Sequence, residues 1–165
     1  MPAEGEIQVA NVHVGGLTST GGAAFPFEAG ARGEAVRLLA VHYSYQPFPA
    51  NGSYLIFAGL SSNPETSTAP PASFLAFLAD KAIYGASAYS INEVVGAAGV
   101  WQVRTSTQVI PLYGIIRPRR QLVVVHMTIG GIFEIKAEIY YQPVALGKTD
   151  LDALNLKYGK YRRTA

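Results

Sequence analysis

The sequence predicts an all-β fold: a single-domain antiparallel β-sandwich, jelly-roll-like, with about eight strands, one inserted helix and a short C-terminal helix. Residues 121–129 carry apolar side chains on both faces and no formal charge, which is typical of a strand covered on both faces. Residues 132–142 alternate between apolar and polar side chains, which is the period of a strand with one buried face. Gly130 and Gly131 between these runs predict a two-residue hairpin turn.

The first part of the chain is predicted to contain three strands. The strand over 6–14 changes phase partway along, which indicates a bulge or a sheet edge. Residues 15–33 are rich in Gly, Ser and Thr and are predicted to form a loop. The strand over 35–46 carries apolar or aromatic residues on both faces, so both faces are expected to be covered. An Asn-Gly pair then turns the chain into a strand over 53–60.

The spacing of apolar residues predicts a helix over 73–84. Pro71 suits the first turn of this helix, and Gly85 suits its C-terminal cap. Apolar side chains recur at helical spacing and are expected to face the core. This stripe consists of Phe74, Leu75, Leu78 and Ala82.

The strand pattern resumes after this helix. Further strands are predicted over 86–95, 100–105 and 107–117. They precede the strands predicted over 121–129 and 132–142. Pro111 interrupts the last of the three, and proline within a strand marks an edge or a bulge.

The chain is predicted to be one β-sandwich domain over 1–147, followed by a C-terminal helix and basic tail over 148–165. The helix is expected over 150–158, with Thr149 as its N-cap. A jelly roll is preferred to an immunoglobulin-like sandwich. The two-residue hairpin predicted after residue 129 argues against a strict jelly roll, because successive jelly-roll strands often cross between sheets.

The composition limits the classes of function. With 165 residues, 49% hydrophobic and 15% charged, the chain carries little charge to cover its surface, which predicts self-association; a large closed sandwich is the alternative. A net charge of +2 gives no basis for a nucleic-acid-binding domain. The absence of cysteine excludes disulfides and cysteine metal sites. Without a signal-peptide pattern or a membrane-spanning run, the chain is expected to be soluble and assembled inside a cell.

The sequence predicts no enzyme, no cofactor and no small-molecule substrate. The three histidines, His13, His42 and His126, are isolated in separate strands and lack the close pairing of a metal-binding motif. Residues 85–89 begin like a nucleophile elbow but lack its closing glycine, and they lie between a helix and a strand, which reverses the required order.

Two clusters of basic residues are candidates for partner or phosphate contact. The first is Arg117, Arg119 and Arg120, at a turn between two apolar strands, where guanidinium groups can bind a phosphate or carboxylate; the alternative is a solvated turn. The second is Lys160, Arg162 and Arg163. These residues alternate with tyrosines, a pattern that can contact nucleic acid or cross a partner subunit. The C-terminal segment is therefore predicted to be an assembly element.

The arrangement of about eight strands, a helix after an early strand and long Gly/Ser/Thr/Pro-rich loops resembles small virus capsid proteins with a single jelly roll. The resemblance implies a coat subunit that self-assembles into an icosahedral shell. Its partners would be other copies or a second capsid protein, with nucleic acid or membrane contact by the basic tail. Its location would be the virion, assembled in the host cytoplasm.

The main alternative is a cellular β-sandwich binding module for carbohydrates or receptors. In such a module, surface aromatic rings rather than subunit contacts bind the ligand. The candidate rings are Trp101, Tyr43, Tyr45, Tyr54 and Tyr113. An enzyme of the cupin or hydrolase type is the third reading.

Overall fold

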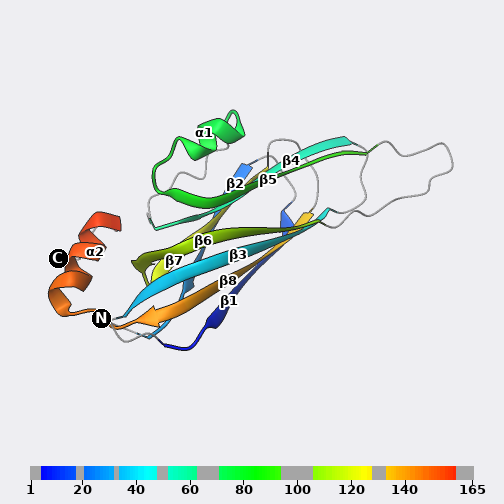
Figure 1. Cartoon of the computed structure of the whole chain (residues 1–165). Coiled ribbons are helices and arrows are strands. Elements are labelled where there is room, and N and C mark those ends of the chain that lie inside the picture. Colours follow the sequence, from blue (N-terminus) through cyan, green and yellow to red (C-terminus); the bar gives the residue numbers. More distant parts are fainter. Residues whose placement is uncertain are drawn as a thin grey trace.

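The computed structural model shows a β-sandwich of two four-stranded antiparallel sheets, as the sequence predicts (Figure 1). It describes residues 5–17, 21–31, 34–47, 52–62, 71–93, 106–127 and 133–158. The strands are β1 Gln8–Leu17, β2 Gly21–Glu28, β3 Ala35–Pro47, β4 Gly52–Ser61, β5 Ile83–Glu93, β6 Ser106–Pro118, β7 Arg120–Met127 and β8 Phe133–Val144. The helices are α1 Phe74–Leu78 and α2 Lys148–Tyr158.

Strands that are consecutive in the sequence lie in different sheets, except for β4 and β5, which pair with each other. Sheet A has the order β1-β8-β3-β6, and sheet B has the order β2-β7-β4-β5. The hairpin predicted at Gly130 and Gly131 is therefore wrong, because β7 pairs with β2 and β4 while β8 pairs with β1 and β3. The two glycines themselves lie outside the described residues. The argument that this hairpin made against a strict jelly roll no longer applies.

A bulge in β3 corrects the prediction that both faces of this strand are covered. The pairing of β3 with both neighbours shifts register between Leu38 and Ala40. One extra residue at this point returns the later side chains to the same face, because strand side chains alternate with period two. The buried residues of the inner face are Val36, Leu38, Val41, Tyr43 and Tyr45. All five belong to the main core between the sheets.

Strand β2 occupies part of the segment 15–33 that the sequence predicts as a loop. Residues 21–28 pair with β7 along their whole length, and Phe27 is buried in the core. Pro26 is tolerated because β2 is an edge strand of sheet B, and no other described strand pairs with its free side and needs the missing N–H. The loop prediction is therefore wrong over this strand, where the Gly-rich composition concealed an edge strand.

The predicted helix over 73–84 is too long, since α1 ends at Leu78 and β5 begins at Ile83. The side chain of Ser73 accepts a hydrogen bond from the Ala76 N–H at 3.1 Å and caps the start of α1. The carboxylate of Asp80 accepts a hydrogen bond from the Ala82 N–H at 2.9 Å. This turn ends the helix, as Asp side chains that bond the backbone two residues on often do.

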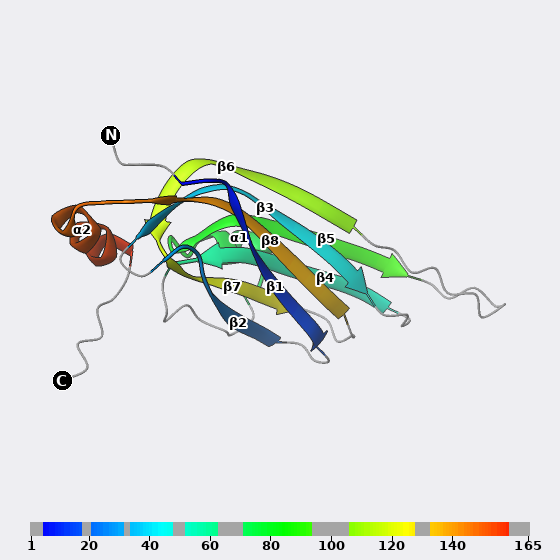
Figure 2. The same ribbon diagram turned by 90° about the horizontal axis from the view of Figure 1, so that it is seen from below.

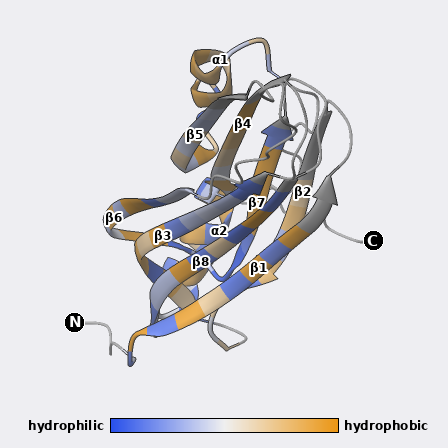
Figure 3. Cartoon of the chain, turned by 90° about the vertical axis from the view of Figure 1, so that its right-hand side faces the viewer, coloured by the Kyte–Doolittle hydropathy of each residue, from blue (hydrophilic) through white to orange (hydrophobic). Residues whose placement is uncertain are grey.

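The apolar stripe predicted for this helix is also wrong in two of its four members. Leu75 and Leu78 are 78% and 44% exposed, whereas Phe77, outside the stripe, is the buried residue of α1. Phe77 and Phe74 pack against Phe57 of β4, with ring centroids 6.0 and 5.3 Å away. This five-residue helix lies beside β4 and β5 of sheet B (Figure 3). It covers the sheet with these two rings and leaves Leu75 and Leu78 exposed.

Strand β7 is central in sheet B and is covered on both faces, as predicted. Val123 and Val125 face the core between the sheets, while Val124 lies in a second cluster on the outer face. The buried members of this outer cluster are Phe57, Phe77, Ile83 and Val124. Helix α1 therefore forms a partial third layer on sheet B.

The remaining elements agree with the prediction more closely. β1 and β6 are the edge strands of sheet A, and Pro111 of β6 lies opposite the bulge of β3. β8 buries Ile135, Ala137 and Ile139 on its inner face. Helix α2 begins at Lys148, so Thr149 lies inside the helix and is not its N-cap. The strand predicted over 100–105 lies outside the described residues. Neither helix of the described residues has the length and apolar composition needed to cross a bilayer.

Candidate partner-contact site

The arginine cluster lies at the end of the sandwich that also carries α2 (Figures 1 and 2). Arg119 and Arg120 connect β6 to β7 and form ion pairs with Glu28, the last residue of β2. The Arg120 Nε lies 2.8 Å from a carboxylate oxygen of Glu28. The main chain reinforces this contact, because the Ala29 N–H donates to the Arg119 carbonyl at 3.0 Å. Two guanidinium groups therefore share one carboxylate, which leaves one positive charge in excess.

Arg117 has a different environment from the other two arginines. Its guanidinium carbon lies 4.3 Å from the ring centroid of Tyr84 and 4.0 Å from that of Tyr158. The cation therefore lies against two aromatic rings, an arrangement stabilised by the ring quadrupoles. Tyr84 belongs to β5 in sheet B and Tyr158 is the last residue of α2. Arg117 thus connects both sheets to the C-terminal helix.

The pKa values of Tyr84 and Tyr158 shift in opposite directions, because Tyr84 is largely buried and Tyr158 lies beside a lysine. Burial raises the pKa of Tyr84, and the nearby Arg117 charge opposes that rise. The contact with Lys157 lowers the pKa of Tyr158, and the Arg117 charge adds to this effect. The Tyr84 hydroxyl also donates to the Gln121 side chain, whose amide donates to the Arg120 carbonyl at 2.7 Å. These hydrogen bonds hold the ring of Tyr84 through contacts that do not involve α2.

The structure gives each described arginine of the predicted cluster a partner within the chain. Arg119 and Arg120 bind Glu28, and Arg117 stacks on two rings. Contact of these residues with an external anion or subunit stays a prediction. The other cluster, Lys160, Arg162 and Arg163, lies outside the described residues.

A set of polar contacts between the sheets was not visible in the sequence. The Tyr43 hydroxyl on sheet A donates to the Gly85 carbonyl on sheet B at 2.8 Å. The Gln108 side chain of β6 donates to the Ala88 carbonyl of β5 at 3.1 Å and contacts the Ser87 hydroxyl. Ser87 is therefore a buried partner of Gln108 that helps to join the edges of the two sheets. The sequence offers no signal for these pairs, because the partners are far apart in the chain and their meeting depends on strand order.

The three histidines lie in separate environments. His13 Nε2 lies 3.6 Å from Glu134 Oε2, and the ring of His42 packs on Tyr140 with centroids 4.6 Å apart. His126 is buried on the outer face of sheet B and meets Phe77 edge to face at 5.2 Å. Within the described part of the chain, no group of three His, Asp or Glu side chains could hold a metal ion.

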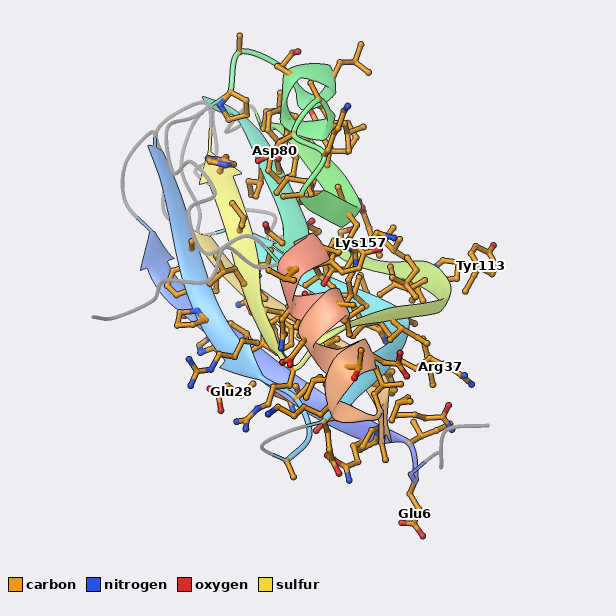
Figure 4. All side chains as sticks on the ribbon, turned by 90° about the vertical axis from the view of Figure 1, so that its left-hand side faces the viewer. Glu6, Glu28, Arg37, Asp80, Tyr113 and Lys157 are labelled. Carbon is orange, nitrogen blue, oxygen red and sulfur yellow. The ribbon has the colours of Figure 1, made fainter. Side chains whose placement is uncertain are left out.

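The aromatic candidates for a ligand-binding surface separate into two groups. Tyr43 and Tyr45 are fully buried in the core, so they cannot line a surface groove. Tyr113 is 91% exposed and projects from β6 (Figure 4). Its φ of 49° places it in the left-handed region, which is uncommon for a residue other than glycine. The side chains of Trp101 and Tyr54 lie outside the described residues.

The burial of His126 predicts a loss of stability in mild acid. Burial lowers the pKa of His126 from its ordinary value, and its Nδ1 has no hydrogen-bond partner in the described structure. Below a pH of about 6.5 the unfolded chain binds a proton that the folded chain does not, so the free energy of unfolding falls as pH falls, by at most about 1.4 kcal/mol per unit. This loss continues until the pH reaches the lowered pKa of the folded state.

Urea unfolding of the wild-type chain measures this effect between pH of about 7.5 and about 5.5, which is one unit on each side of the ordinary histidine pKa of about 6.5. The variant His126→Phe should be less sensitive to acid over that interval. The control His13→Asn, which changes an exposed histidine, should keep the acid sensitivity due to His126. An equal pH dependence in wild type and His126→Phe would contradict the assignment.

The chain matches no protein-family model and no curated protein.

Proposed function

We propose that this protein is a virus capsid subunit with a jelly-roll fold that self-assembles into an icosahedral shell. The observation that carries the proposal is the strand pairing: β1 pairs with β8, β2 with β7, β3 with β6 and β4 with β5. This nested pairing folds one long antiparallel ribbon into two facing four-stranded sheets. Such double-sheet jelly rolls are a recurrent architecture of viral capsid proteins.

The surface supports a subunit that contacts several neighbours. Large apolar side chains are exposed on β1, β6, α1 and α2, which lie on different sides of the sandwich (Figures 1 and 2). The exposed apolar residues of these elements are Val9, Val109, Leu75, Leu78 and Leu156. A shell subunit needs apolar contacts on more than one side, because it meets several neighbours at once. The low charged fraction of 15% agrees with a surface that is partly covered in an assembly.

The proposed partners are other copies of the chain or a second capsid protein. The basic residues of the tail are the candidate contact with an acidic neighbour, nucleic acid or membrane. The tail carries Lys157, Lys160, Arg162 and Arg163. Four charges per subunit neutralise few phosphates, so this tail would not condense a genome by itself. The proposed location is the virion.

The proposal is tested by measuring the mass of the purified chain over a wide concentration range. We expect multi-angle light scattering to show a concentration-dependent rise in mass, and electron microscopy to show closed particles of uniform diameter. Adding glycans or acidic peptides should not be needed for this rise. A stable monomer at high protein concentration, or mass growth into irregular aggregates alone, would contradict the coat function. Tight binding of a glycan by such a monomer would favour the binding module instead.

A further inference from the structure

Helix α2 lies on the sandwich without becoming part of its core. None of its residues, all of which the structure describes, is buried. One face is half-buried and consists of Leu151, Asp152, Leu154, Asn155 and Tyr158. Figure 4 shows α2 crossing the end of the sandwich in front of the strands. An eleven-residue helix is marginal in water by itself, so its stability depends on the surface on which it docks.

The docking surface contains one specific receptor for α2. This receptor, called the slot below, is the guanidinium of Arg117 on β6 together with the ring of Tyr84 on β5, and the Tyr158 ring lies 4.0 Å from the same guanidinium. Both walls of the slot are fixed by the sandwich itself, because Tyr84 binds Gln121 and Arg117 lies at the end of β6. Every copy of the chain therefore presents the same slot and carries the same tyrosine.

The connector between β8 and α2 allows the helix to extend away from its own sandwich. Val144 is fully buried at the end of β8, whereas Ala145 and Gly147 are exposed. The connector 145–147 spans about 10 Å when extended, and α2 spans about 16 Å. The arm thus reaches about 26 Å from the end of β8, which is close to the diameter of a small domain.

We infer that α2 is an exchangeable arm, and that Tyr158 of one copy stacks on the Arg117 guanidinium in the slot of a second copy. The contacts made in the exchanged and unexchanged states are the same, so the balance depends on the connector and on the local concentration of copies. The inference rests on the proposed function for that local concentration, since neighbouring subunits in a shell are held side by side. The stack of Tyr158 on Arg117 then joins two subunits in the exchanged state, as it joins α2 to β6 within one chain in the unexchanged state.

A complementation experiment tests whether the stack forms between copies. Arg117→Ala removes the slot and leaves the arm, whereas Tyr158→Ala removes the ring and leaves the slot. Each variant alone should raise the protein concentration needed for association by about tenfold, the scale of a stacked cation. Mixed in equal amounts, they should recover part of this loss, because the arm of the first can enter the slot of the second. The readout is light scattering of each variant and of the mixture.

Matched controls separate this effect from general changes in the surface. Lys81→Ala removes an exposed cation in the turn before β5, and Tyr113→Ala removes an exposed tyrosine of β6. Both should associate like wild type. Circular dichroism checks that each chain is folded, and Arg117→Lys, which keeps the charge but stacks less well, replaces Arg117→Ala if that chain unfolds.

The outcomes distinguish this inference from the proposed function. If the mixture behaves as the average of the two variants, the stack forms only within a chain and the exchange is wrong, even where wild type still forms shells. If the wild-type chain forms dimers, the mixture recovers the association that each variant loses and no shell appears, then the exchange stands and the coat function fails. If the wild-type chain stays monomeric at every concentration, both are wrong.

Discussion

Replacing Val124 by Asp is expected to lower the free energy of unfolding by about 3 kcal/mol or more. Val124 is fully buried in the outer cluster of sheet B, beside Phe57 and Phe77. A carboxylate placed there loses its water and gains no charged partner from these rings, so the folded state either holds an unpaired charge or takes up a proton. Urea denaturation followed by circular dichroism measures the effect.

The matched control is the same substitution at an exposed strand position. Val109 of β6 is 54% exposed, so Val109→Asp should change the free energy of unfolding by about 0.5 kcal/mol or less. A large loss in both variants would indicate that Asp disfavours these strands in general. An unchanged stability of Val124→Asp would mean that α1 does not cover this face in solution.

The parts of the fold that the sequence predicts well depend on patterns within one strand. The alternation of β8 and the double apolar character of β7 are local, so each could be read without knowledge of the partner strand. The errors arise where the outcome depends on distant residues. Beyond the bulge at Leu38, every side chain of β3 lies on the face opposite to the one that simple alternation predicts. A periodic pattern alone does not locate this bulge. Pairing with β7 makes a strand of residues 21–28, whose own composition favours a loop.

The candidate site was predictable only in its charges. Arg117, Arg119 and Arg120 stand out in the sequence, but their partners come from segments whose structure was predicted differently. Glu28 ends a strand in a segment that the sequence predicts as a loop, and the sequence predicts that Tyr84 ends a helix. The contacts of these residues follow from strand order and register, which bring together residues far apart in the chain. Tyr158 carried a signal as an aromatic residue near basic ones, yet its position on Arg117 depends on where α2 docks.

Gly85 illustrates how one residue sets the spacing between the two sheets. It has a φ of +55°, in the region that glycine adopts without strain, and lies where β5 approaches the core of sheet A. A Cβ at this position would lie 2.9 Å from Leu112 Cδ2 and 3.3 Å from Val41 Cγ1. Its carbonyl accepts the Tyr43 hydroxyl at 2.8 Å, so a shift of the backbone would also disturb a contact between the sheets.

Gly85→Ala is therefore expected to cost about 3 kcal/mol, from backbone strain together with overpacking of the core. Gly114→Ala separates the two causes, because Gly114 has a φ of +72° but a Cβ there meets only Arg37 Cδ at 3.6 Å and Cγ at 3.8 Å. It should lose about 1 kcal/mol from backbone strain alone. Urea unfolding of both variants gives the difference, which measures the overpacking against Leu112. Equal losses in the two variants would show that this contact relaxes without cost, and the close approach of the sheets at Gly85 would then not limit the size of the residue.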